Sequence, residues 1–152
     1  LKIAFPQLQI TLLDSLNKRV GFLNTVIQEL GLTGIPAVHG RAEDFGRNKE
    51  YREQFDLCVS RAVANLSTLS EYCLPFVKAG GEFLPYKSGK VEEEAREAES
   101  AVKKLGGSMR ETKTLVLPGT DVDRTFVPID KINMTPKKYP RKAGMPGKEP
   151  LK

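Results

Sequence analysis

The 152-residue sequence predicts an α/β fold with a mainly parallel sheet, helices on both faces of the sheet and an antiparallel pair of strands at one edge. Two observations favour this class. Short apolar runs alternate with stretches of helical periodicity up to about residue 110, which is typical of strand–helix–strand crossovers in a parallel sheet. Two later apolar runs follow each other through a short polar turn, as antiparallel neighbours do.

The first strand–helix unit is the clearest. The run 9–13 is β-branched and aliphatic and too short for a helix, so it predicts a buried strand, and it ends at Asp14, a residue type that caps helices. Apolar residues at steps of three and four then predict a helix over 16–30. Gly31 can end this helix in a left-handed conformation.

The middle of the chain continues the alternation. Short apolar runs predict strands at 35–39 and 56–60, with a polar and partly helical connection between them. Helical spacing of apolar residues over 66–76 comes next, and Gly80 and Gly81 separate that helix from the apolar pair 83–84. A further helix–strand pair is therefore expected.

The last predicted elements are a helix and two strands. The helix over 91–105 has acidic residues in its first turns and lysines in its last, which complements the helix dipole, so we interpret the acidic run as a solvated face. The runs 112–117 and 125–132 predict the antiparallel pair. Pro85 and Pro128 lie inside proposed strands and remove a backbone donor each, which indicates edge strands, bulges or shorter strands.

Several classes of protein are disfavoured. No apolar run approaches the ~18 residues that cross a bilayer, and the first residues lack the order of a signal peptide. Cys58 and Cys73 lie in apolar runs, where free cysteine behaves as a small buried hydrophobe, so we expect a reducing, cytoplasmic compartment and no metal site. His39, the sole histidine, ends an apolar strand, where packing or a surface position is favoured over catalysis. A Ser-His-Asp triad, a histidine-rich metal site and a phosphate-binding P-loop motif are absent.

The net charge of +5 is unevenly distributed. Residues 131–152 carry seven lysines and arginines against Glu149 alone, a net +6, whereas residues 1–130 carry −1. Within this tail, four basic side chains surround one aromatic ring. Lysine and arginine contact phosphates, and a tyrosine face can stack on an unpaired base, so the tail predicts RNA contact; the alternative is a disordered tail that aids solubility. The residues concerned are Lys137, Lys138, Tyr139, Arg141 and Lys142.

Ligands of open parallel sheets bind beyond the carboxyl ends of the strands. Asp14 stands at such an end and could accept both hydroxyls of a ribose, or merely cap the next helix. Glu43 could meet an adenine edge, or be a first-turn helix residue. Arg61 could bind a carboxylate or phosphate, or form a salt bridge with Glu43 or Asp44.

Four segments in the same order resemble the RsmG (GidB) family, bacterial enzymes that make 7-methylguanosine in 16S ribosomal RNA. They are 13–19, 39–43, 60–64 and 135–142. The resemblance implies a Rossmann-like class I methyltransferase fold that binds S-adenosylmethionine, with 16S rRNA or the small ribosomal subunit as partner. It places Asp14 at the ribose, Ala42 and Glu43 at the adenine, and Arg61 in the cofactor pocket beside the acceptor base.

The same resemblance places the five tail residues on the RNA-facing surface. Lys87 resembles a lysine near the end of the next family strand, but its neighbour Pro85 departs from the family pattern, so its role stays open. Residues 1–133 would form the methyltransferase domain, and 134–152 a basic RNA-contacting segment of the same domain. Guanine N7 already presents a lone pair, so no general base is required.

A first strand and Gly-rich turn, against which the methionine part of the cofactor would lie, do not precede Asp14. We therefore expect an incomplete methyltransferase domain, which alone folds poorly and does not methylate. Two other functions stay open. One is a non-enzymatic RNA-binding module, and the other is a nucleoside-cofactor enzyme such as a nicotinamide oxidoreductase.

Overall fold

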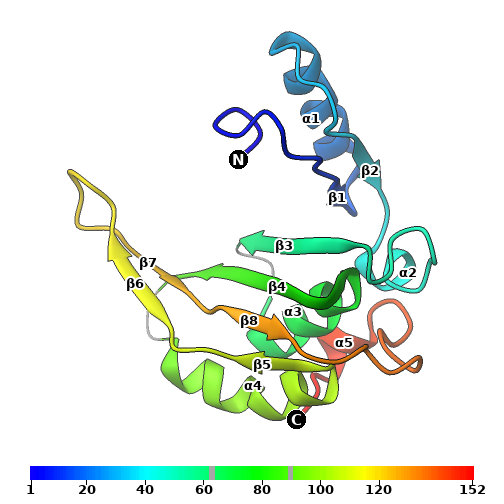
Figure 1. The fold of residues 1–152 in the computed structure, drawn as a ribbon, viewed down its shortest axis with the longest axis vertical. Helices are drawn as coiled ribbons and strands as arrows, with labels where there is room; N and C mark the ends of the chain where they lie inside the picture. The colour runs from blue at the N-terminus through cyan, green and yellow to red at the C-terminus, as the bar shows by residue number, and fades with distance from the viewer. Residues whose placement is uncertain (62–63, 89–90) are drawn as a thin grey trace. The chain divides into compact units, whose positions relative to one another are not determined.

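The computed structural model describes residues 1–61, 64–88 and 91–152. The chain forms two compact units, Leu1–Ala42 and Glu43–Lys152, each of which is described by itself (Figure 1). No helix in these described ranges is long and apolar enough to cross a membrane.

The first unit is one strand–helix–strand motif. Strand β1 (Leu12–Asp14) pairs in parallel with β2 (Ala37–His39), and helix α1 (Asn17–Glu29) joins them. The predicted helix and second strand are confirmed, and Gly31 follows the helix with the expected positive φ of 58°. The first strand is shorter than predicted and half-buried.

The second unit contains a six-stranded sheet with strand order β5-β8-β4-β7-β6, and β3 pairs with β4. Helices α3 and α4 lie together on one face of this sheet (Figure 1). The strands are β3 (Phe55–Arg61), β4 (Val77–Lys87), β5 (Gly107–Met109), β6 (Lys113–Val116), β7 (Asp123–Phe126) and β8 (Ile129–Lys131). The helices are α2 (Ala42–Phe45), which begins at the end of the first unit, α3 (Leu66–Cys73), the 3-10 turn η1 (Leu74–Phe76), α4 (Glu92–Lys104) and α5 (Met145–Lys148).

The core of the second unit lies between the sheet and these two helices. Leu66, Leu74, Phe83, Leu105 and Ile129 have no exposed surface. Helix α3 begins where predicted, because the Asn65 side chain accepts a hydrogen bond from the Thr68 N–H. The apolar spacing that predicted both helices therefore identifies their buried faces correctly.

Antiparallel pairing extends further than predicted. Only β3 and β4 are parallel neighbours among the described strands of this unit, whereas β4 pairs antiparallel with both β7 and β8. The predicted strand 125–132 divides at Pro128, and the unpredicted β5 adds a further antiparallel neighbour to β8. The predicted hairpin between 112–117 and the first half of 125–132 is confirmed as β6 and β7.

Pro85 lies in the central strand β4, not at an edge. Its carbonyl accepts from the Val127 N–H at 3.3 Å, in the interval where the β7 partner ends and the β8 partner begins. Because the amide and carbonyl of a strand residue point to the same side, the donor that Pro85 lacks would face this interruption in the ladder. A proline is thus tolerated in a central strand.

Strand β3 is only partly buried. Leu57 and Val59, which alternate with Cys58 along the strand and so share the other face, are 47% and 39% exposed. Cys58 packs against the core from the opposite face. Cys73 is buried, and its hydrogen bond with Cys58, together with burial, raises the pKa of its thiol. Both cysteines are free.

Candidate nucleic-acid interface and cofactor-binding residues

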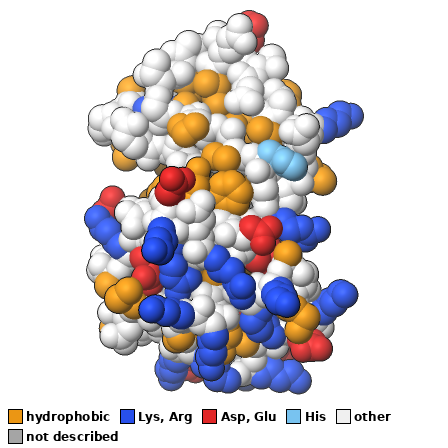
Figure 2. Space-filling model, turned by 90° about the vertical axis from the view of Figure 1, so that its right-hand side faces the viewer, with side chains coloured by type: hydrophobic (Ala, Val, Ile, Leu, Met, Phe, Trp, Pro, Cys, Tyr) orange, Lys and Arg blue, Asp and Glu red, His pale blue; other side chains and the backbone are white. Residues whose placement is uncertain are grey.

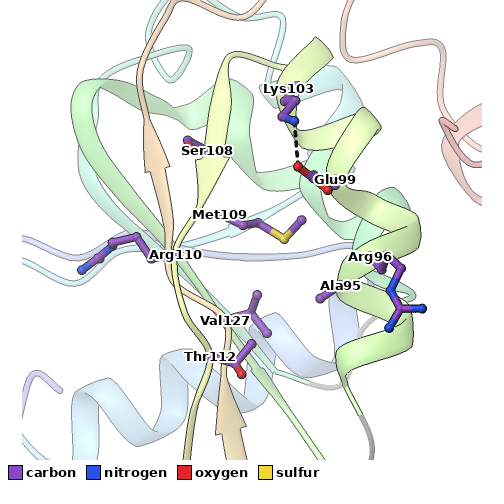
Figure 3. Close-up of a pocket in the computed structure, with 9 residues that line it drawn as sticks. All are labelled: Ala95, Arg96, Glu99, Lys103, Ser108, Met109, Arg110, Thr112 and Val127. Atoms are coloured by element: carbon purple, nitrogen blue, oxygen red, sulfur yellow. Dashed lines mark hydrogen bonds and ion pairs between the residues drawn. The ribbon is translucent and has the colours of Figure 1, made fainter.

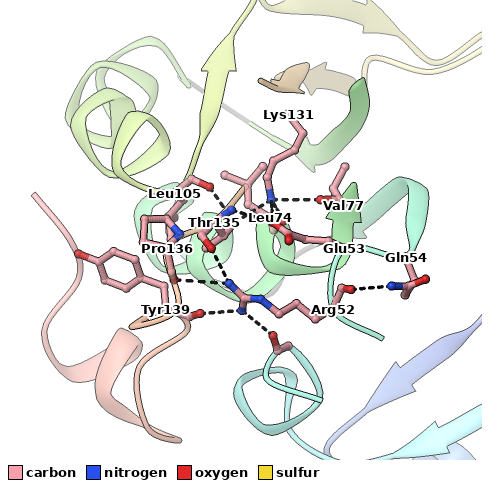
Figure 4. Close-up of polar contacts among 11 residues, drawn as sticks. Arg52, Glu53, Gln54, Leu74, Val77, Leu105, Lys131, Thr135, Pro136 and Tyr139 are labelled. Carbon is pink, nitrogen blue, oxygen red and sulfur yellow. Dashed lines mark hydrogen bonds and ion pairs between the residues drawn. The ribbon is translucent and has the colours of Figure 1, made fainter. Parts of the chain in front are cut away.

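The tail that follows β8 is largely irregular, as predicted, but its backbone is held in place (Figure 4). The guanidinium of Arg52 donates to the carbonyl oxygens of Thr135 at 2.6 Å and Tyr139 at 2.8 Å, and to the carbonyl of Gly46 in its own loop at 2.9 Å. Five donors in a rigid fork let one side chain satisfy several backbone acceptors. Arg52 thereby joins the α2–β3 loop to the tail.

Lys131 lies just before the tail and holds its first residues in place (Figure 4). Its side chain is fully buried, and its ammonium group donates to the carbonyls of Leu74 and Val77, to the Thr135 hydroxyl and to the Glu53 carboxylate. Burial lowers the pKa of Lys131, and the neighbouring Glu53 partly opposes this shift. Lys131 therefore adds no charge to the surface, although the sequence counts it among the basic residues of the tail.

Two of the predicted RNA-contacting residues have structural partners. Arg141 forms a bidentate ion pair with Glu71, whose side chain is fully buried, and Nη2 lies 2.7 Å from Oε2. Tyr139 is only 8% exposed and belongs to the hydrophobic core. The apolar body of the ring is more stable there than in water, so it does not present a free face on which a base could stack.

The other three, Lys137, Lys138 and Lys142, are exposed. None of them forms an ion pair within the described residues, and the Lys138 ammonium lies 5.2 Å from the centre of the Tyr139 ring. Lysine and arginine side chains gather on the face of the second unit drawn in Figure 2. The structure thus separates the predicted tail residues into two that fix the segment and three that face solvent.

Glu43 also holds the tail. It lies in the first turn of α2 and is 4% exposed, and its Oε1 accepts a hydrogen bond from the backbone N–H of Gly144 at 2.8 Å. Gly144 has a φ of 84°, which favours glycine, and precedes α5. This contact agrees with the alternative in which Glu43 is a first-turn helix residue rather than an adenine contact. Ala42 begins the same helix and is half-buried.

Asp14 ends β1 in the first unit. Its Oδ1 accepts from the Leu16 N–H at 2.8 Å, and its Oδ2 lies 3.4 Å from the guanidinium of Arg19. The carboxylate therefore supports the turn into α1, but Asp14 is not the N-cap of that helix, since Leu16 occupies the N-cap position. The Asp14 side chain keeps 24% of its surface exposed at the carboxyl end of a parallel strand.

Arg61 ends β3 in the second unit. It is exposed, and no ion pair with Glu43, Asp44 or any other described residue is formed. The salt-bridge alternative for Arg61 is therefore wrong among the described residues. A guanidinium without a protein partner at the end of a parallel strand is suited to binding a negatively charged group. The two residues that follow it, 62 and 63, lie outside the described residues.

Lys87, whose role the sequence left open, is held by Glu94 at 2.6 Å and by the carbonyl of Ala64 at 2.8 Å. Glu94 also accepts from the backbone N–H of Leu66, the first residue of α3. The acidic run 92–94 was predicted to be a solvated face. This prediction is wrong for Glu94, because its carboxylate caps the neighbouring helix α3. Together these groups fix the ends of β4 and α3 relative to each other.

A separate pocket of about 300 Å³ lies between α4 and β5 (Figure 3). Lys103 and Glu99 pair across one side of it, and Arg96 stands on α4 at its rim. None of the predicted site residues lines this pocket. Among the described residues, no group of three or more histidine, cysteine or acidic side chains could hold a metal ion.

Three residues that hold the tail, Arg52, Glu53 and Glu71, were missed by the sequence analysis. All three lie 60 or more residues before the tail, so no local spacing connects them with it. The one available signal was Glu71, a charged residue in the otherwise apolar and hydroxyl-bearing helix 66–73. An acidic residue at such a position requires a buried partner.

The family model described as "GidB: rRNA small subunit methyltransferase G" matches residues 1–124. The chain belongs to this family. A GidB relative from Limosilactobacillus reuteri, the ribosomal RNA small subunit methyltransferase G, is 54% identical over 99% of the chain. The same enzyme of Lachnoclostridium phytofermentans is 56% identical over 99% of the chain. The chain spans 63% and 62% of the lengths of these two GidB relatives.

Solved structures confirm the fold class. A putative methyltransferase from Thermoplasma acidophilum matches with a TM-score of 0.62 at 11% identity, over 81% of this GidB chain and 57% of its own. An rRNA methylase from Streptococcus thermophilus matches with a TM-score of 0.58 at 13% identity, over 82% of this chain and 74% of its own. This GidB chain therefore has the class I methyltransferase fold predicted from the sequence.

Proposed function

We propose that the protein containing this chain transfers a methyl group from S-adenosylmethionine to guanine N7 in 16S ribosomal RNA of the small subunit. The observation that carries this proposal is the identity of 54% over 99% of the chain with a ribosomal RNA small subunit methyltransferase G. In this proposal residues 1–133 belong to the methyltransferase domain and 134–152 form its RNA-contacting segment. The cytoplasm, where ribosomal RNA is found, is the expected compartment.

Two of the four proposed cofactor residues have side chains that support this proposal. Asp14 presents a partly exposed carboxylate, an acceptor for ribose hydroxyls, and Arg61 presents a guanidinium that has no ion-pair partner among the described residues and is suited to a negatively charged group. Ala42 contributes backbone at the start of α2, where it borders the adenine. Glu43 fits less well as an adenine contact, because its carboxylate binds Gly144.

Bound S-adenosylmethionine supplies a methyl group on a positively charged sulfur. Guanine N7 carries a lone pair and no proton, so the protein has to hold the acceptor base in line rather than remove a proton. This agrees with a chain in which His39, the single histidine, is exposed and bonds to the carbonyl of Ser15. In this proposal catalysis rests on positioning, and the chain needs no general base.

The exposed lysines 137, 138 and 142 support RNA as the partner. They project from a backbone that Arg52, Glu43 and Glu71 fix, so a binding surface of this kind does not have to be ordered when RNA arrives. In this proposal Tyr139 and Arg141 hold that surface in place and do not contact RNA themselves. The Tyr139 ring packs in the core, and the Arg141 guanidinium is paired with Glu71.

The test is methyl transfer from radiolabelled S-adenosylmethionine by the complete protein, with the modified base identified. Naked 16S rRNA and small subunits are offered separately. We expect label in 7-methylguanosine of 16S rRNA. RNA that binds but gains no label contradicts the proposal in favour of a non-enzymatic RNA-binding module.

Cofactor titration separates the remaining alternative. The complete protein is titrated with S-adenosylmethionine and with NAD, and binding is followed calorimetrically. We expect binding of S-adenosylmethionine alone. Selective binding of NAD would indicate a nicotinamide oxidoreductase and refute methyl transfer.

A further inference from the structure

One arginine outside the tail contacts it through a single atom. Arg47 lies in the loop after α2, and its Nε donates a hydrogen bond to the carbonyl oxygen of Pro140 at 2.8 Å. Pro140 is buried and stands between Lys138 and Lys142 in the sequence. The loop around Arg47 is therefore joined to the middle of the exposed basic segment of the tail.

The rest of the Arg47 guanidinium is unoccupied. The residue is exposed, and its two terminal nitrogens have no hydrogen-bond or ion-pair partner within the described residues. Arg52 is different, because the Gly46, Thr135 and Tyr139 carbonyls already occupy both of its terminal nitrogens. An anchored guanidinium with a free fork of donors has the geometry that binds a phosphate group.

We propose that Arg47 binds a phosphate of the RNA backbone and extends the RNA surface from the tail lysines to the α2–β3 loop. The inference rests on the proposed function, since it names a contact of the same RNA. The Nε bond to Pro140 holds the guanidinium in place before binding, so less side-chain entropy is lost on contact with RNA. Lys49, exposed in the same loop, adds to the positive charge there.

The variant Arg47→Gln tests the charge separately from the anchor. The Nε2 amide of glutamine stands at the position of the arginine Nε and can still donate to Pro140, but the positive charge and the free fork are gone. Arg47→Lys keeps the charge. The matched control is Arg96→Gln, which removes an exposed arginine on α4, beside a pocket that no tail residue lines.

The measurement is binding of the complete protein to a 16S rRNA transcript as a function of salt. Loss of one phosphate contact lowers the slope of log K against log salt by about 0.7–0.9, and the affinity by roughly five- to eightfold at 0.1 M salt. We expect this change for Arg47→Gln, a retained slope for Arg47→Lys and no change for Arg96→Gln. Thermal unfolding of each variant shows whether its fold is intact.

A salt slope of Arg47→Gln equal to that of the wild type would overturn the inference, whether or not affinity falls. A residue that only positions the tail makes no contact with an RNA phosphate, so its replacement leaves the salt slope unchanged. An equal loss in Arg96→Gln would overturn it as well, since the effect would then be one of net charge. Wild-type protein that methylates the transcript, with an unaffected Arg47→Gln variant, refutes the phosphate contact alone. Wild-type protein that binds and methylates neither the transcript nor small subunits refutes the proposed function and this inference together.

Discussion

The carboxylate of Glu71 accepts both the side chain and the backbone of Arg141, with Oε1 2.7 Å from the Arg141 backbone nitrogen and Oε2 2.7 Å from Nη2. Glu71 has no exposed side-chain surface, whereas Arg141 keeps 24% of its own. The hydrogen bond with Glu71 raises the pKa of Arg141 further above its usual value. A fully buried charge on α3 thus fixes a residue of the segment proposed to contact RNA.

Replacing Arg141 with alanine should destabilise the fold strongly. The variant leaves the fully buried carboxylate of Glu71 without its ion-pair partner, and an uncompensated buried charge costs about 3–5 kcal/mol. Denaturant unfolding measures this loss. Arg141→Lys keeps the charge but lacks the fork, so we expect a smaller loss; an Arg141→Ala variant as stable as the wild type would show that the pair contributes nothing.

The stability of the protein should rise with pH in the alkaline range because of Lys131. Its pKa in the folded state lies below the ordinary value of 10.5, so between these two values the unfolded chain binds more protons than the folded one. Burying the charged ammonium of Lys131 lowers the free energy of unfolding, and this loss is removed as pH rises through this window and the folded protein releases the proton. The unfolding free energy of the wild type minus that of Lys131→Met should rise with pH through this window, and a difference that stays constant with pH would contradict this.

Simultaneous replacement of Lys137, Lys138 and Lys142 with alanine should weaken RNA binding without affecting cofactor binding. Loss of up to three phosphate contacts lowers the salt slope by about 2–3. Because all three side chains are exposed, we expect the unfolding free energy to change little. The control replaces Lys78, Lys103 and Lys113, exposed lysines of the sheet and α4, and an equal loss of slope there would contradict a specific role of the tail.

Arg61→Ala should lower methyl transfer by tenfold or more while RNA binding persists. An exposed side chain that has no ion-pair partner among the described residues contributes little to folding, so stability should stay within about 0.5 kcal/mol of the wild type. Activity assays and RNA binding are measured on the same preparation. Full activity of the variant would remove Arg61 from the site.

Asp14→Asn separates the two roles of Asp14. The amide oxygen can still accept from the Leu16 N–H, so the turn into α1 is preserved, whereas the charge proposed to bind the ribose is lost. A hydrogen bond to a charged group contributes about 1.5–3 kcal/mol, so affinity for S-adenosylmethionine should fall roughly tenfold to hundredfold. Unchanged affinity would leave Asp14 with the structural role alone.

Local patterns predicted the elements well. The spacing of apolar residues identified α1, α3 and α4, because apolar residues at steps of three and four lie on one side of a helix. The sheet was harder, since the run 125–132 is continuous in sequence and yet divides at Pro128 into strands that pair with different parts of β4. Strand β5, at Gly107–Met109, has no sequence signal, because glycine is rare in strands and three residues show no period.

The candidate site was predictable only in part. Charge and composition identified the tail, and strand ends identified Asp14 and Arg61, because these depend on local sequence. The inward roles of Tyr139 and Arg141 depend on the core and on Glu71 in α3, which lies 70 residues from Arg141. A basic residue that faces RNA and one that faces a buried carboxylate look the same in sequence.

Several of the contacts that hold the tail come from residues far from it in sequence. Arg52 and Thr135 are 83 residues apart, and Arg47 and Pro140 are 93 residues apart. Closing loops of this length costs entropy before the contacts are made, so the tail gains its order late in folding. Trypsin should therefore cut after Lys137, Lys138 or Lys142 in a chain that has not finished folding, and much more slowly once Arg52 has joined the α2–β3 loop to the tail.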